Sequence, residues 1–150
     1  TQDVAYTTAY FDAGQVLVVP TNSAAGGMAD LDGQSLAVEL GALGHVEARA
    51  WQERLAALTV ATFGSADEVL AAVAAGTVDA ALVDSVSARL YLRDHADSGL
   101  MRLDPPAVSE PYAAAVRIGD RTLLRRLDDA LAALERSGQL EDMTRRWLGP

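Results

Sequence analysis

The chain has 150 residues, half of them hydrophobic, and a net charge of −9 from 12 basic and 21 acidic residues. This composition predicts a globular protein with one core or two small lobes, and the negative charge disfavours nucleic acid or an anionic membrane as a partner. All 12 basic residues are arginine and cysteine is absent, which excludes a lysine Schiff base, a thiol nucleophile, a disulfide and a thiolate metal site.

Residues 1–12 are polar and aromatic without a clean period, and we expect them to form a tail. No apolar run approaches the roughly 20 residues that span a bilayer. The amino terminus also lacks a basic stretch followed by a hydrophobic one, so an export signal is expected to be removed or absent from this sequence. His45 and His95 lack the spacing of a metal-binding helix, which disfavours a histidine metal site.

The first predicted strand covers residues 15–20, a β-branched run closed by a proline. Residues 21–30 are small and contain Gly26-Gly27, so they are the best linker candidate in the chain. Residues 31–34 form a turn. A second strand is predicted at residues 35–40, and it leads into the segment Gly41-Ala42-Leu43-Gly44.

A helical pattern begins at Leu43. Apolar residues recur there at intervals of three and four, as in an amphipathic helix packed on a sheet: Val46, Ala50, Trp51, Leu55 and Leu58. A short strand is predicted at residues 58–62. Ser65 and Glu68 then form a capping-box pattern that begins a helix, and Gly76 is expected to end it with a left-handed cap.

The stretch from Gly76 to Asp84 combines a turn, an apolar strand and an acidic residue. Residues 78–83 are apolar except for Asp79, which is typical of a parallel strand covered on both faces. Ligands of open α/β sheets bind outside the carboxyl ends of the strands, so Asp84 is a candidate to contact a cation or an ammonium group. The alternative is that Asp84 only caps the helix predicted at residues 85–94.

Strands and helices alternate through residue 94, which predicts an α/β fold with right-handed crossovers and a mostly parallel sheet flanked by helices. A brief apolar run at residues 100–103 precedes Pro105-Pro106, and the prolines disfavour a continuing helix or a central strand there. A strand returning from the α/β unit is predicted at residues 112–118.

Two helices are predicted at the carboxyl terminus. Asp120 can cap the first, which ends near Gly138 and carries one stripe of leucines at positions 123, 124, 127, 131 and 134. The second is shorter and includes Trp147, which is expected to pack against the protein. The acidic pair Asp128-Asp129 is expected to face solvent.

Seven segments, taken in this order, resemble a known family. They are Val16-Leu17-Val18-Val19, Leu31-Asp32-Gly33-Gln34, Gly41-Ala42-Leu43-Gly44, Gly76-Thr77-Val78-Asp79-Ala80 with Asp84, Tyr112-Ala113-Ala114-Ala115-Val116, Gly138-Gln139-Leu140 and Arg146-Trp147-Leu148-Gly149. The order is similar to that in the extracytoplasmic solute-binding proteins of amino-acid ABC transporters, family 3, which have the type 2 periplasmic-binding fold.

The resemblance implies two α/β lobes joined by hinge strands, with a small ligand in the cleft between them. Residues 17–110 would form the second lobe, and residues 1–16 and 111–150 the hinge return and a residual first lobe. The crossings would lie at residues 16–20 and 112–117. Most of the first lobe, which normally supplies an arginine for the ligand carboxylate, would precede Thr1, so the chain is expected to be a fragment, a truncated natural form, or a protein completed by another chain.

The resemblance also implies a binding site. Gly41, Ala42, Leu43 and Gly44 match the loop whose N–H groups receive a ligand carboxylate, and Asp84 matches the residue that receives the α-ammonium group. Ala42 and Leu43 depart from the family, which usually has hydroxyl residues there, so hydrogen bonds to the ligand are lost. The alternatives are a tight turn at the glycines and a solvated His45 beside them, rather than ligand contacts.

The function implied is capture of a small polar ligand, an amino acid or a related amine or carboxylate, outside the cytoplasm and delivery to ABC transporter membrane subunits. No catalytic residue, cofactor or metal is expected. The alternatives are a ligand-sensing domain of a receptor or cell-wall enzyme, and a dehydratase-like enzyme that uses Asp84 and His45. Apolar surface left by a missing lobe predicts homo-oligomers formed through the hinge strands and the leucine-rich helix.

Overall fold

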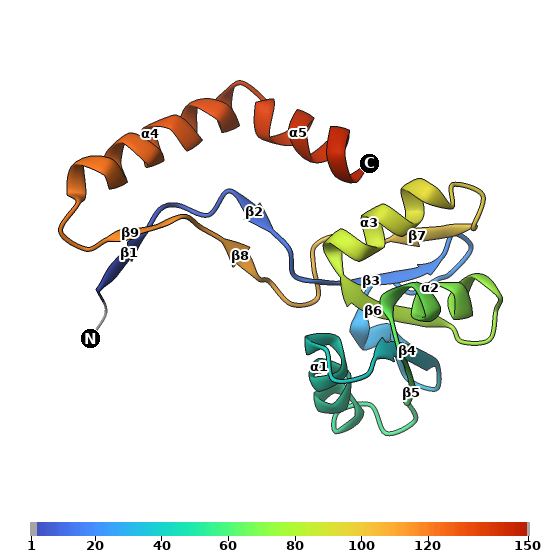
Figure 1. The fold of residues 1–150 in the computed structure, drawn as a ribbon. Helices are drawn as coiled ribbons and strands as arrows, with labels where there is room; N and C mark the ends of the chain where they lie inside the picture. Colours follow the sequence, from blue (N-terminus) through green and yellow to red (C-terminus); the bar gives the residue numbers. More distant parts are fainter. Residues whose placement is uncertain (1–2, 150) are drawn as a thin grey trace.

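The computed structural model describes residues 3–149 and shows an α/β unit connected to a long two-stranded ribbon and a pair of helices (Figure 1). The strands are β1 (Val4–Tyr6), β2 (Phe11–Asp12), β3 (Gln15–Pro20), β4 (Ser35–Glu39), β5 (Thr59–Phe63), β6 (Ala80–Asp84), β7 (Leu100–Arg102), β8 (Pro111–Tyr112) and β9 (Ala115–Arg117). The helices are the 3-10 helix η1 (Met28–Leu31) and the α-helices α1 (Leu43–Gln52), α2 (Ala66–Ala74), α3 (Ser85–Asp94), α4 (Arg121–Arg136) and α5 (Gln139–Leu148).

Five strands form the central sheet in the order β5-β4-β6-β3-β7. Strand β4 is parallel to both β5 and β6, whereas β3 is antiparallel to both β6 and β7. Four strands therefore run in one direction and only β3 runs against them. The predicted α/β class with a mostly parallel sheet is confirmed, but the βαβ pattern begins at β4 and not at β3.

Helices cover both faces of this sheet (Figure 1). On one face, α2 and α3 bury Val69, Leu70 and Tyr91 against β3 and β6. On the other face, α1 and η1 bury Ala48 and Leu31 against the same strands. The alternate side chains of β3 point into the two cores, which explains why this strand has an uninterrupted apolar sequence.

Residues 21–30, predicted to be a linker, pack inside the α/β unit. Ala25, Met28 and Leu31 are buried in the core on the α1 face, and Met28 and Leu31 lie three residues apart on η1. The small residues and Gly26-Gly27 suggested a flexible connection, but the two apolar side chains bring the segment onto the sheet.

The buried face of α1 also differs from the prediction. The helix ends at Gln52, and Val46, expected in the core, is 65 % exposed. Gly44 and Ala48 are the buried positions, and Trp51 packs against the same core. Small residues on this face bring α1 close to the sheet. The helical spacing correctly places Trp51 and Leu55 against this core but wrongly places Val46 there.

Residues 3–12, predicted as part of a tail, form one strand of the ribbon. Strand β1 pairs with β9 and β2 pairs with β8, both antiparallel. The predicted strand at residues 112–118 is therefore present as two short pieces. The crossing expected at residues 16–20 is wrong, because this segment is β3 inside the central sheet. Thr1 and Gln2 of the predicted tail lie outside the described residues.

Helix α4 lies along the ribbon, and α5 returns to α3 (Figure 1). Asp128 on α4 accepts hydrogen bonds from the Thr8 N–H and hydroxyl at 2.8 and 3.2 Å, so this acidic residue is not simply solvated. At the other end, Arg93 of α3 donates to the Trp147 carbonyl at 3.0 Å. Trp147 is 67 % exposed, so the packing against the protein that was predicted for it is largely absent.

None of the helices between residues 3 and 149 combines the length and the apolar composition needed to cross a bilayer.

Candidate functional site

The residues predicted to bind a ligand lie at one edge of the sheet, on neighbouring strands. Gly41 to Gly44 follow β4, and Asp84 ends β6, which pairs with β4. From β4 the chain continues through α1 to β5 on one side, whereas from β6 it continues through α3 to β7 on the other. Connections that leave adjacent strands in opposite directions create a crevice at their carboxyl ends, where ligands of this fold class bind.

Gln15 lies next to both Asp84 and Gly44, and it is not among the predicted site residues. It is opposite Asp84 in the β3–β6 pairing and is only 5 % exposed. A Cβ on Gly44 would be 2.8 Å from Gln15 Oε1 and 2.7 Å from the Leu82 carbonyl oxygen. Gly44 is therefore required for α1 to approach β6 this closely. The available signal was a polar residue at the start of an otherwise apolar strand.

The amino terminus of α1 carries free N–H groups. Its N-cap residue, Ala42, has no side-chain acceptor, and the first turn has no acidic residue. Within residues 3–149, the N–H groups of Leu43 and Gly44 have no hydrogen-bond acceptor. Unpaired N–H groups and the positive end of the helix dipole favour a bound anion.

The other two helices that begin at this edge are capped. The Ser65 hydroxyl accepts from the Glu68 N–H at 3.3 Å, and Glu68 accepts from the Gly64 N–H at 2.9 Å. The predicted capping box is thus present with its second bond moved by one residue, from Ser65 to Gly64. Asp84 caps α3. Among α1, α2 and α3, only α1 lacks a side-chain cap.

Asp84 has the structural role considered as its alternative, and this role leaves half of the carboxylate available. One oxygen, Oδ1, accepts from the Ser87 N–H at 2.9 Å. The other oxygen has no hydrogen-bond partner within the described range 3–149, and the residue is only partly buried. A carboxylate has about four acceptor positions, so capping α3 is compatible with accepting a hydrogen bond from a ligand ammonium group.

His45 contacts the loop itself. Its Nδ1 accepts from the Gly41 N–H at 3.2 Å. Gly41 has a φ of 83°, a left-handed conformation that favours glycine, and it turns the chain from β4 into α1. The His45 ring therefore helps to hold the turn that presents the free N–H groups.

A second pair of residues fixes the spacing between the two strands that carry the site. Asp79 Oδ2 accepts from the Ser35 hydroxyl at 2.6 Å and from the Ser35 N–H at 2.8 Å. These bonds lower the pKa of Asp79, and the side-chain bond has the larger effect. Ser35 begins β4, and Asp79 immediately precedes β6, so the pair joins the strands at the end opposite to the ligand edge.

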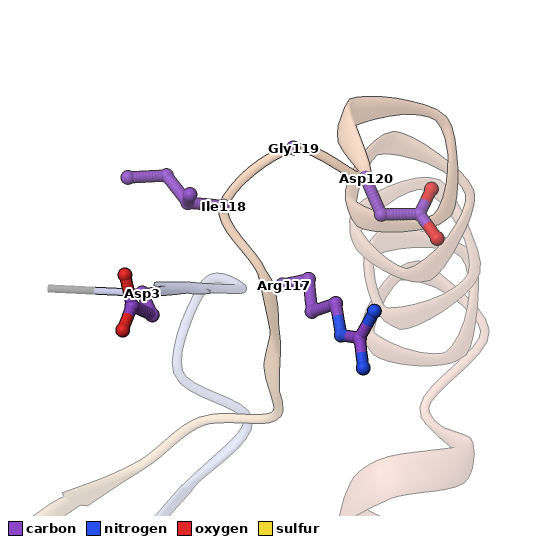
Figure 2. A pocket seen from close by; sticks show the side chains of 5 residues that line it. All are labelled: Asp3, Arg117, Ile118, Gly119 and Asp120. Carbon is purple, nitrogen blue, oxygen red and sulfur yellow. The ribbon is translucent and has the colours of Figure 1, made fainter.

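A hollow lies elsewhere, at the turn between β9 and α4. It has a volume of about 480 Å³ and is bounded by Asp3, Arg117, Ile118, Gly119 and Asp120. The side chains do not converge on a common point, since Ile118 points away from Arg117 (Figure 2). This hollow is an open depression in the surface at the end of the ribbon, and it lacks the convergent polar groups of a binding site.

The predicted site is an open shelf. Gly41 to Gly44 and Asp84 line none of the five most prominent hollows on residues 3–149. Side chains suited to a metal ion do not cluster in groups of three or more histidine, aspartate or glutamate residues within the same range. The arrangement offers hydrogen-bond donors on one side and a carboxylate on the other, without a group positioned for metal chemistry.

The chain was compared with known proteins. The sequence pattern of the bacterial extracellular solute-binding proteins, family 3, matches residues 1–150. The glutamine-binding protein GlnH of an ABC transporter from Bacillus subtilis (strain 168) is 26 % identical over 149 residues, covering 98 % of this chain and 52 % of the relative. The amino-acid-binding protein AabA of Dichelobacter nodosus is 42 % identical over 45 residues, 30 % of this chain and 18 % of the relative.

Solved structures share the fold. An ancestral arginine-binding protein with bound arginine superimposes with a TM-score of 0.63 at 28 % identity, over 97 % of this chain and 65 % of that one. The L-cystine solute receptor of Neisseria gonorrhoeae, in its unliganded open conformation, gives a TM-score of 0.83 at 20 % identity, over 97 % and 60 %.

The share of the sequence that is matched differs between this chain and its relatives. The chain spans about half the length of the Bacillus subtilis relative, although nearly all of this chain is matched. The family pattern matches it from residue 1 to residue 150, and the structural superpositions include both the sheet and the ribbon. The chain belongs to the bacterial extracellular solute-binding proteins of family 3.

Proposed function

We propose that this chain binds an amino acid outside the cytoplasm as the second lobe of a solute-binding protein and delivers it to the membrane subunits of an ABC transporter. Family membership supports a binding role, and two relatives are named as amino-acid-binding and glutamine-binding proteins. The ligand is captured and released unchanged, since the site shelf offers recognition groups but no nucleophile with an adjacent base.

The observation that carries the proposal is the pairing of the uncapped amino terminus of α1 with the Asp84 carboxylate. The Leu43 and Gly44 N–H groups suit a carboxylate, and Asp84 Oδ2 suits an ammonium group. An α-amino acid carries both charges on one carbon. The two halves of the site lie on neighbouring strands, β4 and β6, so a single small zwitterion can reach both.

We assign residues 17–110 to the second lobe, and residues 1–16 and 111–150 to the hinge return and the remainder of a first lobe. The sheet with α1, α2 and α3 supports this division, because its elements extend from Gln15 to Arg102. The ribbon of β1, β2, β8 and β9 supports a pair of hinge strands. A ligand on the open shelf would be enclosed when a first lobe closes over it.

The test is a titration of the ¹⁵N-labelled chain, followed by amide NMR. L-glutamine, N-acetyl-L-glutamine and L-glutamine amide present both charges, only the carboxylate and only the ammonium group. We expect saturable shifts at Leu43 and Gly44 with the first two compounds. We expect shifts at Asp84 and Ser85 with the first and third, and the tightest binding with the first.

Asp84→Asn is the diagnostic variant, and Asp97→Asn is the matched control on an exposed residue outside the site. Asp84→Asn should weaken the binding of L-glutamine and its amide while sparing the N-acetyl compound. Equal affinity of all three compounds for both variants, or shifts confined to other parts of the chain, would refute the assigned site. L-arginine titrated in parallel checks whether a different side chain is preferred.

A further inference from the structure

A cavity separate from the proposed ligand site lies between α3, β7 and α5. It has a volume of about 320 Å³, and its lining includes three arginines from three different elements: Arg89, Arg102 and Arg145. The remaining lining residues are Glu141, Thr144 and Gly149. The cavity shares no residue with the Gly41–Gly44 and Asp84 shelf, and its volume is at the small end of the range for ligand pockets.

Two of the three guanidinium groups already have carboxylate partners. Arg102 contacts Asp104 at 2.7 Å, and Arg145 contacts Glu141 at 3.0 Å. Arg89 has no carboxylate within salt-bridge distance among residues 3–149. One of its terminal nitrogens donates to the Gly149 carbonyl at 3.3 Å. Its Nε is buried and has no hydrogen-bond acceptor within residues 3–149.

Burial and the positive charge of Arg102 lower the pKa of Arg89, and the negative charge of Asp104 offsets only part of this effect. The charge on Arg89 is therefore not fully compensated. A buried N–H without an acceptor is unusual in a folded protein and calls for an unseen partner. An unpaired N–H group on a guanidinium whose charge is not fully compensated suits a negatively charged partner.

A purely structural role for Arg89 accounts for only part of its geometry. Arg89 and Arg93 both donate to carbonyls at the carboxyl end of α5, which favours cations. Arg93, however, also pairs with Asp94 at 2.7 Å and does not line the cavity. The capping role satisfies one end of the Arg89 guanidinium and leaves the Nε–H facing no acceptor.

We propose that this arginine cavity binds a small oxyanion, a phosphate or a free carboxylate, with the Arg89 guanidinium group as the principal donor. A guanidinium group presents parallel N–H donors that match two oxygens of such an anion. Arg102 supplies further positive charge. Glu141 also borders the cavity, but Arg145 holds its carboxylate, so it does not oppose an anion as a free charge would.

The binding is measured on the 150-residue chain by following the arginine Nε–H resonances during titration with sodium phosphate and, separately, sodium acetate. Sodium chloride at equal ionic strength is the reference. We expect a saturable shift of the Arg89 Nε–H signal with at least one oxyanion and none with chloride. The stronger of the two titrations identifies the preferred anion. A shift that is linear in concentration, or equal in chloride, overturns the proposal.

Arg89→Gln and Arg93→Gln form a matched pair. Each removes a hydrogen bond from α3 to a carbonyl at the carboxyl end of α5, but only Arg89→Gln removes a donor of the cavity. We expect Arg89→Gln to weaken oxyanion binding by about tenfold or more and Arg93→Gln to leave it within about twofold. Arg89→Lys keeps the charge without the Nε–H and should also bind weakly. Wild-type affinity in Arg89→Lys overturns the assigned donor, and the wild-type titration decides the proposal if Arg89→Gln does not fold.

Discussion

Asp12 joins the two strands of the ribbon where they enter the central sheet. Its Oδ1 accepts from the Gly14 N–H at 2.8 Å and the Glu110 N–H at 2.9 Å, and its Oδ2 accepts from the Ser109 hydroxyl at 2.6 Å. Gly14 is packed so closely that a Cβ there would lie 1.9 Å from the Val108 carbonyl oxygen. One carboxylate therefore connects segments almost a hundred residues apart in the sequence.

These hydrogen bonds make the stability of the ribbon dependent on pH. The bonds from Ser109 and then Glu110 lower the pKa of Asp12 below its ordinary value of 3.8, although burial acts in the opposite direction. Because the folded-state pKa is the lower one, the stabilisation is complete above the unfolded-state pKa. It is lost as the pH falls through the folded-state pKa.

The prediction for Asp12→Asn is a loss of about 1 kcal/mol in the free energy of unfolding at neutral pH, because donors from Ser109 and Glu110 lose a charged acceptor. The variant should also show a shallower decline of Tm than the wild type between about pH 5 and pH 2.5. Thermal melts followed by circular dichroism measure both effects. Asp97→Asn, which alters an exposed aspartate, should follow the wild type, and an Asp12→Asn curve parallel to the wild type would contradict this role.

At the scale of single residues, chain order predicts the two halves of the proposed site but not Gln15 beside them. Gly41 to Gly44 and Asp84 each lie where a strand is followed by a helix, and local sequence reveals both kinds of element. Gln15 reaches the same place only because β3 is antiparallel to β6 and pairs Gln15 with Asp84. That register depends on the whole sheet, so a polar residue at the start of an apolar strand marks position 15 but does not indicate that it pairs with Asp84.

Among the elements, helices with strong local sequence patterns were predicted, whereas strands formed by pairing between distant parts of the chain were not. Helices α3 and α4 agree closely with their expected ranges, since each has a capping aspartate and a regular apolar spacing. Strands β1 and β2 are only three and two residues long, and their partners lie about 100 residues later in the chain. A segment of this kind has no periodicity of its own, which is why residues 3–12 were taken for a tail.

The uncapped start of α1 is an element-scale feature with a direct test. Ala42 has φ −72° and ψ 169°, an extended conformation suited to an N-cap, but its side chain accepts no hydrogen bond. Ala42→Ser and Ala42→Asp each supply an acceptor and should each raise the free energy of unfolding by about 1 kcal/mol. Their effects on a ligand carboxylate should differ, because only aspartate brings a negative charge to the same N–H groups.

We therefore expect Ala42→Asp to raise Tm and to abolish the shifts that N-acetyl-L-glutamine causes at Leu43 and Gly44. Ala42→Ser should raise Tm and retain these shifts. Thermal melts and the amide NMR titration measure the two properties on the same samples. Unchanged carboxylate binding in Ala42→Asp would show that the anion does not bind at the start of α1.

At the scale of the whole molecule, the exposed apolar side chains are concentrated away from the sheet. Of the eleven large apolar residues that are most exposed between residues 3 and 149, eight belong to the ribbon, the turn after it or the last two helices. The other three, Leu40, Leu43 and Val46, border the ligand shelf. Neither α4 nor α5 buries a single residue, although α4 has a continuous stripe of leucines.

The 150-residue chain is therefore expected to self-associate through the leucine face of α4, since a second copy is the apolar surface available to cover it in a purified sample. Sedimentation velocity at micromolar concentration should show a species heavier than 15.8 kDa. The double variant Leu127→Gln and Leu131→Gln should shift the distribution towards the monomer. Val46→Gln, which changes an equally apolar residue exposed on α1, should not. A wild-type monomer with a cooperative melt would show that contacts of α4 with the ribbon, such as Asp128 with Thr8, are sufficient to hold the helix without a partner.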